Sequence, residues 1–104
     1  MPGMNSASQL RDRASGVVDA ARRFEAAAHA PESYPGAPES LVALEEALQA
    51  LSAAWYRLAA APRHADGLSR EQEVHTLATL HDVAAAFAHS ARTCQTGRTR
   101  MGIR

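Results

Sequence analysis

The sequence contains no lysine, only one cysteine and few aromatic residues. All 11 basic side chains are arginines, and they balance 11 acidic ones. No net charge therefore favours binding to nucleic acid or to an anionic membrane. Cys94 has no second cysteine to pair with inside the chain, so nothing indicates an oxidising compartment.

Long apolar runs are also missing. No stretch reaches the ~18 apolar residues of a membrane span, and the first residues, MPGMNSASQLRDRA, lack the apolar core of a signal peptide. We therefore expect a cytoplasmic protein with no membrane contact. The richness in alanine, with arginine in place of lysine, is typical of GC-rich bacterial genomes.

The 104 residues predict a single helical domain over 1–104. Pro and Gly cluster at 30–38 and 62–67 and divide the chain into three segments. In each segment apolar residues recur at steps of three and four, which indicates an amphipathic helix. The three helices are expected at about 7–29, 39–60 and 69–94.

Short connections make consecutive helices antiparallel neighbours, so we expect an all-α, up-down-up three-helix bundle. Residues 1–5 and 95–104 are expected to be flexible termini. A chain of this size buries a modest core, and alanine makes up much of its apolar stripes. The bundle is therefore expected to associate into a larger helical bundle.

The middle helix has the clearest pattern. Pro38 and Glu39 suit its first turn. Trp55 is expected in the core, and Tyr56 lies about 100° further round, where it would line a groove or an interface. The apolar stripe consists of Leu41, Leu44, Leu48, Leu51, Trp55 and Leu58. The face expected to be solvated consists of Glu45, Glu46, Gln49 and Ser52.

The last helix begins with a capping box, in which Ser69 and Gln72 satisfy each other's backbone amides. The following sequence QTG is expected to end the helix near residue 94. Its apolar stripe consists of Leu77, Leu80, Ala84, Phe87, Ala91 and Cys94. The apolar stripe of the first helix consists of Leu10, Ala14, Val17, Ala21, Phe24 and Ala28.

His75, Asp82 and His89 are seven residues apart and share the face opposite the apolar stripe of the last helix. Positions seven apart lie about 10 Å apart along the axis, too far for two ligands of one zinc ion. We expect a solvated face, with a groove or interface as the alternative. Glu71 and His75, four apart, are expected to form an ordinary surface pair.

Two short stretches resemble helical families. The exposed His75 with Thr76 to Thr79 is similar to the phosphate-accepting helix of histidine phosphotransfer domains, which implies phosphorylation of His75. Ala78 and Thr79 stand where those domains have a basic residue and a glycine. The spacing of Arg70 and His75 resembles the Arg-x(4–6)-His motif of HEPN-type ribonucleases, which implies that both side chains act on an RNA phosphate.

The chain from residue 95 onward carries arginine and no acid, so Arg98, Arg100 and Arg104 could contact an anion. No residue is assigned to catalysis, to a metal or to a cofactor. The leading expectation is a small non-enzymatic module that self-associates, as a homodimer, or binds a partner protein helix. The alternatives are phosphotransfer or ribonuclease activity using His75 and Arg70, and a nucleic-acid accessory protein using the basic tail.

Overall fold

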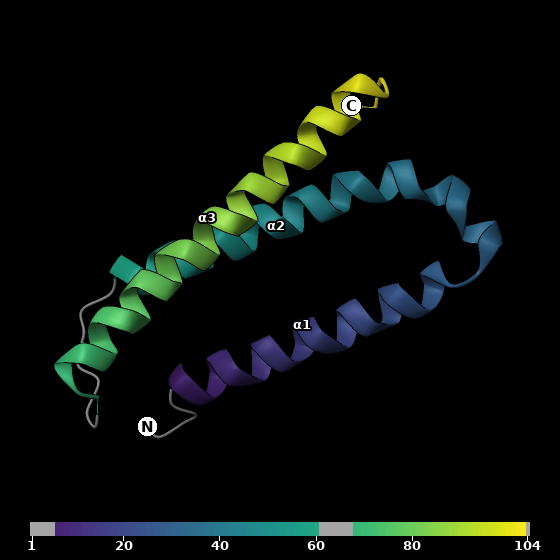
Figure 1. Cartoon of the computed structure of the whole chain (residues 1–104). Coiled ribbons are helices and arrows are strands. Elements are labelled where there is room, and N and C mark those ends of the chain that lie inside the picture. The colour runs from purple at the N-terminus through teal and green to yellow at the C-terminus, as the bar shows by residue number, and fades with distance from the viewer. Residues whose placement is uncertain (1–5, 61–67, 104) are drawn as a thin grey trace. The chain divides into compact units, whose positions relative to one another are not determined.

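The computed structural model describes residues 6–60 and 68–103 (Figure 1). All of its regular elements are helical, and these residues contain no strand. The expected all-α fold with three helices is confirmed. The elements are α1 (Ser6–Ala28), a short 3₁₀-helix η1 (Pro31–Gly36), α2 (Ala37–Ala60) and α3 (Arg70–Arg100).

The chain divides into two compact units, and the first runs from Met1 to Ala37. It holds α1 and η1. The hydroxyl of Ser33 in η1 donates a hydrogen bond of 2.7 Å to the carbonyl of Ala27 at the end of α1. The bounds of α1 agree with the expected 7–29 within one residue. No residue of α1 is buried, and Phe24 in its apolar stripe is 59% exposed.

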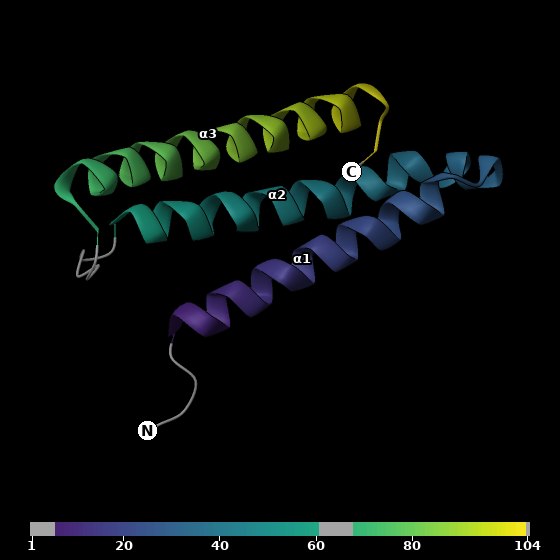
Figure 2. The same ribbon diagram turned by 60° about the horizontal axis from the view of Figure 1, so that its bottom comes forward.

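The second unit, from Pro38 to Arg104, is a helical hairpin. α2 and α3 run side by side in opposite directions (Figures 1 and 2). α2 begins as expected, with Pro38 and Glu39 in its first turn. The predicted capping box is present at the start of α3, where Ser69 Oγ accepts from the Gln72 amide and Gln72 Oε1 accepts from the Ser69 amide.

The prediction that the last helix ends near residue 94 is wrong, because α3 continues to Arg100 with Gly97 inside it. The helix ends instead at Arg100, two residues before Gly102, whose φ of +76° lies in the left-handed region. The amide of Gly102 donates to the Thr99 carbonyl and that of Ile103 to the Arg98 carbonyl. This pair of bonds is a Schellman motif, which satisfies carbonyls that the last turn leaves open.

Small residues and one ion pair form the line along which α2 and α3 meet. We call it the contact stripe. It comprises the buried residues Glu45, Ser52 and Ala59 of α2, and Ala84, Ala91 and the largely buried Arg98 of α3. Ser52 Oγ donates a hydrogen bond of 2.9 Å across the stripe to the Ala84 carbonyl. Ala84 is fully buried, so the helices approach closely where side chains are shortest.

The contact stripe corrects one expectation for α2. Glu45 and Ser52 were expected on a solvated face, and both are buried. The leucine stripe lies to one side of the contact, where Leu48 and Trp55 are half-buried and Leu44 is exposed. A three-four spacing locates an apolar stripe on a helix, but it does not say which neighbour that stripe faces.

The expectations for residues 1–5 fall outside the described residues. The single-domain expectation and the flexibility of residues 95–104 stay predictions, although the latter segment is helical as far as Arg100. In the described part of the chain, no helix combines the length and the apolarity that crossing a membrane requires.

Candidate functional site

The hairpin has two different sides, and the contact stripe separates them. A residue three positions after a stripe residue lies about 60° to one side, and a residue four positions after lies about 40° to the other. Because the helices are antiparallel, the same rule places Leu48 and Trp55 of α2 on the same side as Phe87 and Cys94 of α3. Gln49, Tyr56, Ala88 and Gln95 share the opposite side.

Gln49, Tyr56, Ala88 and Gln95 all line one shallow hollow of about 340 Å³, which agrees with their placement on one side of the contact stripe. Ala53, Ala91 and Arg92 also line it. Tyr56 is 43% exposed there, and its ring stands edge-on to that of His81, with ring centroids 6.1 Å apart. Tyr56 therefore lines this hollow, and its role at an interface stays a prediction.

The first side carries most of the large apolar residues of the hairpin. We call it the apolar face. Its members are half-buried except Leu44, which is 42% exposed. They are Leu44, Leu48, Leu51, Trp55 and Leu58 from α2, with Leu80, Val83, Phe87 and Cys94 from α3. No large side chain in the described chain is fully buried, so the interior of the hairpin does not absorb this face.

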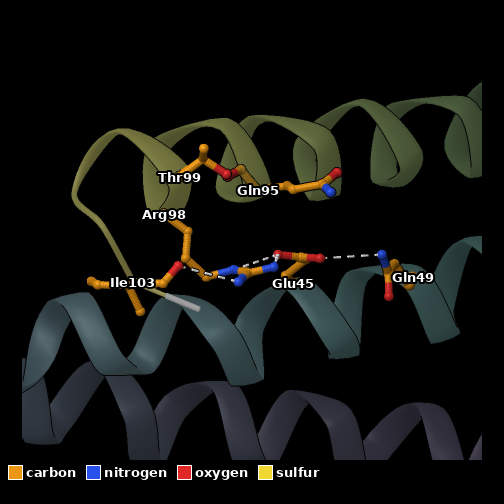
Figure 3. Close-up of polar contacts among 6 residues, drawn as sticks. All are labelled: Glu45, Gln49, Gln95, Arg98, Thr99 and Ile103. Carbon is orange, nitrogen blue, oxygen red and sulfur yellow. Dashed lines mark hydrogen bonds and ion pairs between the residues drawn. The ribbon is translucent and has the colours of Figure 1, made fainter.

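A buried ion pair closes one end of the contact stripe (Figure 3). Arg98 reaches Glu45 Oε1 with Nη2 at 2.6 Å and with Nε at 2.8 Å. Only 11% of the Glu45 side chain and 17% of the Arg98 side chain are exposed. Gln49 Nε2 donates to the second oxygen, Oε2, at 3.4 Å. Both carboxylate oxygens therefore have a donor, as a buried carboxylate requires.

The end of α3 also positions Arg98. The Schellman turn brings the Ile103 carbonyl back toward the guanidinium, and Arg98 Nη1 donates to it at 3.4 Å. Thr99 Oγ1 donates to the Gln95 carbonyl at 2.9 Å (Figure 3). The arginine therefore bridges α2, α3 and the chain that follows α3.

The histidine face is placed as the sequence indicated. His75, Asp82 and His89 are all exposed on α3. His75 Nε2 lies 3.9 Å from Glu71 Oε1, and both side chains are more than three-quarters exposed, so the expected surface pair is confirmed. The His75 and His89 carbonyls accept from Thr79 and Thr93, which are ordinary bonds within a helix.

The three tail arginines have different surroundings. Arg98 already binds the Glu45 carboxylate, which differs from an anion contact open to solvent. Arg100 is exposed in the last turn of α3. Arg104 lies outside the described residues. Arg70 is exposed in the first turn of α3, five residues before the exposed His75.

Residues 6–60 and 68–103 contain no group of three or more His, Cys, Asp or Glu side chains that could hold a metal ion. Cys94 is a half-buried free thiol on the apolar face. Comparisons of the chain with models of protein families, with curated proteins and with solved structures find no match. The arguments about function therefore depend on the geometry of the hairpin.

Sequence reasoning missed the Glu45–Arg98 pair. The two residues are 53 positions apart, and local spacing rules pair only residues within one helix. One signal was present: Glu45, Ser52 and Ala59 repeat every seven residues, as do Ala84, Ala91 and Arg98. Two matched repeats, each with one charge of opposite sign at the same end of an antiparallel pair, could have located the contact stripe.

Proposed function

We propose that the chain is a small non-enzymatic helical module that self-associates through the apolar face of its α2–α3 hairpin. One observation carries the proposal. The large apolar residues of α2 lie beside its contact with α3, and the contact itself uses small residues and an ion pair. Apolar area left half-exposed in this way is stabilised when a further helical surface covers it.

The charge distribution favours a second copy of the chain as that surface. None of the nine residues of the apolar face is charged. The other charged residues of α2, Glu39, Glu46 and Arg57, lie on the far side of the helix by its rotation of 100° per residue. Two such faces can meet without like-charge repulsion, and two hairpins together supply the helices of a four-helix bundle.

The size of the face is adequate for a small specific interface. α2 from Leu41 to Leu58 is about 26 Å long, and two adjacent helices are roughly 20 Å wide, which gives a footprint of roughly 500 Å² per copy. Two copies then bury about 1,000 Å² in total, the lower bound for a specific interface. We therefore expect a dimer that dissociates at micromolar concentrations rather than an obligate one.

The experiment is a light-scattering mass measured over a concentration range for three forms of the full chain. Leu44→Glu places a charge on the apolar face, and Val42→Glu places one on the opposite side of α2. The two residues are similarly exposed, at 42% and 38%. We expect wild type and Val42→Glu to dimerise alike, and Leu44→Glu to need at least a tenfold higher concentration.

A wild-type mass equal to the monomer at all concentrations would contradict the proposal, and so would equal weakening by the two substitutions.

The alternative is an enzymatic activity centred on His75 and Arg70, which would depend on the His75 side chain. His75→Ala must abolish phosphotransfer or RNA cleavage, whereas self-association through the apolar face should tolerate it. A nucleic-acid role of the tail would appear as affinity that falls steeply with salt.

A further inference from the structure

We propose that α1 is a second self-association surface, on which the apolar stripe of α1 pairs antiparallel with the α1 stripe of a second copy of the chain. The inference concerns α1 alone and does not depend on association through the apolar face of the hairpin. No residue of α1 is buried, and the large residues of its stripe are 46% (Leu10), 46% (Val17) and 59% (Phe24) exposed. Such a stripe is stabilised when another helix covers it.

Large and small residues alternate along the stripe of α1. The large ones are Leu10, Val17 and Phe24, and the small ones are Ala14, Ala21 and Ala28. When two copies run antiparallel and cross at residue 19, each residue stands level with the one that lies equally far from 19 on the other side. Every large residue then faces an alanine of the second copy. Such alternation lets two facing rows of side chains interdigitate.

The charges beside the stripe select the same alignment. Arg11 and Glu25 lie on one flank of it, seven residues before and after Val18. In the antiparallel pair this flank meets the same flank of the second copy, so each Arg11 comes beside a Glu25. Symmetry gives two interchain ion pairs, one on either side of the two Val18 residues. A guanidinium has five donors, and one of those of Arg11 reaches Ser8 Oγ at 3.3 Å in the single chain.

Other alignments of two α1 helices lose these contacts. In a parallel pair each residue stands level with itself, so Phe24 meets Phe24 and alanine meets alanine. Glu25 then flanks Ala20 instead of an arginine. An antiparallel pair shifted by seven residues matches only part of the two stripes, and it brings Val18 beside Arg11 or Glu25. The alignment centred on residue 19 is therefore the one in which packing and charge agree.

A shallow hollow on α1 lies at the centre of this alignment. It is lined by Val17, Val18, Ala21, Arg22 and Glu25. Val17 and Val18 of the second copy come against it, because they stand level with residues 21 and 20. The hollow therefore receives two apolar side chains in the antiparallel pair.

The covered area is smaller than that of the apolar face. The 23 residues of α1 are about 34 Å long, and a strip one helix wide, about 10 Å, gives a footprint of roughly 340 Å² per copy. Two copies bury about 700 Å² in total, which is less than a tight interface needs. We therefore expect α1 to pair at higher protein concentration than the hairpin does, and cross-linking is the measurement that detects it.

Single cysteines in the full chain test the inference, in a background of Cys94→Ala and Leu44→Glu that removes the native thiol and association through the hairpin. Val18→Cys reports the antiparallel pair, because the two copies of residue 18 lie about 3 Å apart along the axis. Ala28→Cys reports a parallel pair, since antiparallel copies of residue 28 lie about 27 Å apart. Ser15→Cys, on the outward side of α1, gives the yield of random collisions.

A short bis-maleimide joins the thiols, and the covalent dimer is quantified by gel electrophoresis. We expect Val18→Cys to give at least about ten times the yield of Ala28→Cys or Ser15→Cys, because only residue 18 has its counterpart within reach. A Val18→Cys yield no higher than that of Ser15→Cys would overturn the inference, and it is the result for a stripe covered by something other than a second α1. The highest yield from Ala28→Cys would overturn it as well.

An exchange of charges tests the ion pairs in the Val18→Cys chain at low ionic strength. Arg11→Glu sets carboxylates against each other and should lower the yield about fivefold, whereas Arg23→Glu, the same change on the outward side, should alter it less than about twofold. Adding Glu25→Arg to Arg11→Glu should restore the yield. Residues 11 and 25 lie about 21 Å apart within one helix, so only an interchain pair explains such a rescue. No rescue in chains that keep their helical circular dichroism would contradict the proposed alignment.

Discussion

The two ends of α3 are held by different kinds of contact. At the first end, the capping box joins Ser69 to Gln72, and His75 pairs with Glu71, all within one helix and exposed. At the last end, Arg98 pairs with a residue of another helix and is largely buried. The first end was predicted from the sequence, and the last was expected to be a flexible tail.

The difference teaches how far local rules reach. A cap or an i,i+4 pair depends on residues within one turn, so its spacing is visible in the sequence. The pairing of Glu45 with Arg98 depends on which faces of α2 and α3 meet. Its energetic weight is also different, because exposed pairs contribute little and separating a buried pair leaves an uncompensated charge. Substitutions at the two ends should therefore differ in effect.

The largest effect is expected from Arg98→Ala, which leaves the Glu45 carboxylate buried without its partner. We expect a loss of about 2–4 kcal/mol in the free energy of unfolding, measured by urea denaturation at fixed protein concentration. Arg100→Ala is the matched control, an exposed arginine in the same turn, and should change stability by less than about 0.5 kcal/mol. Equal losses for the two variants would show that the Glu45–Arg98 pair contributes no more to the free energy of unfolding than an exposed arginine does.

The Schellman turn gives the next effect. Gly102→Ala forces an L side chain into the left-handed region and should lower stability by about 1–2 kcal/mol. Gly97→Ala should act in the opposite direction. It lies inside α3, and an added Cβ would meet nothing within 4 Å, so the gain should be about 0.5–1 kcal/mol. Thermal unfolding followed by circular dichroism compares the two, and effects of the same sign would contradict the assigned helix end.

The capping box at the first end should matter less. Ser69→Ala removes the acceptor of the Gln72 amide and should cost about 1 kcal/mol. Ser90→Ala, on an exposed position in the middle of α3, provides the control and should be neutral or slightly stabilising, because alanine is the better helix former. Hydrogen exchange of the Gln72 amide should accelerate in Ser69→Ala alone. An unchanged exchange rate would argue against the cap.

The smallest effect is expected for His75→Ala. The pair with Glu71 is 3.9 Å long and exposed, so stability should change by less than about 0.5 kcal/mol in urea denaturation. A loss above 1 kcal/mol would mean that His75 makes contacts that a solvated face does not provide.

The sequence predicted the three helices because proline, glycine and a three-four apolar spacing are local signals. It predicted the start of α3 for the same reason. It did not predict the end of α3. Gly97 and Gly102 are both glycines near the end of the helix, and the sequence does not show that only Gly102 takes a positive φ. The sequence QTG was read as a break, whereas a helix tolerates one glycine at a cost that neighbouring turns offset.

The candidate site was predicted less well than the fold. Trp55 and Tyr56 lie on different sides of α2, as their rotation of 100° implies, but Trp55 is half-buried and does not belong to the buried core where it was expected. Glu45 and Ser52 were assigned to solvent because polarity usually indicates exposure. Their burial depends on a neighbour that satisfies them, the Arg98 guanidinium and the Ala84 carbonyl. Such tertiary compensation has no signature within a single helix.

The distance in sequence between Glu45 and Arg98 has a consequence for biosynthesis. A ribosome adds about 5–20 residues per second, so the arginine is added roughly 3–10 s after the glutamate, 53 residues earlier in the chain. During that interval the nascent chain holds a carboxylate that has not met its counter-ion. The buried alanines of α3, Ala84 and Ala91, are synthesised before the arginine and can already pack against α2. The ion pair can therefore form only after every other residue of the contact stripe has been synthesised.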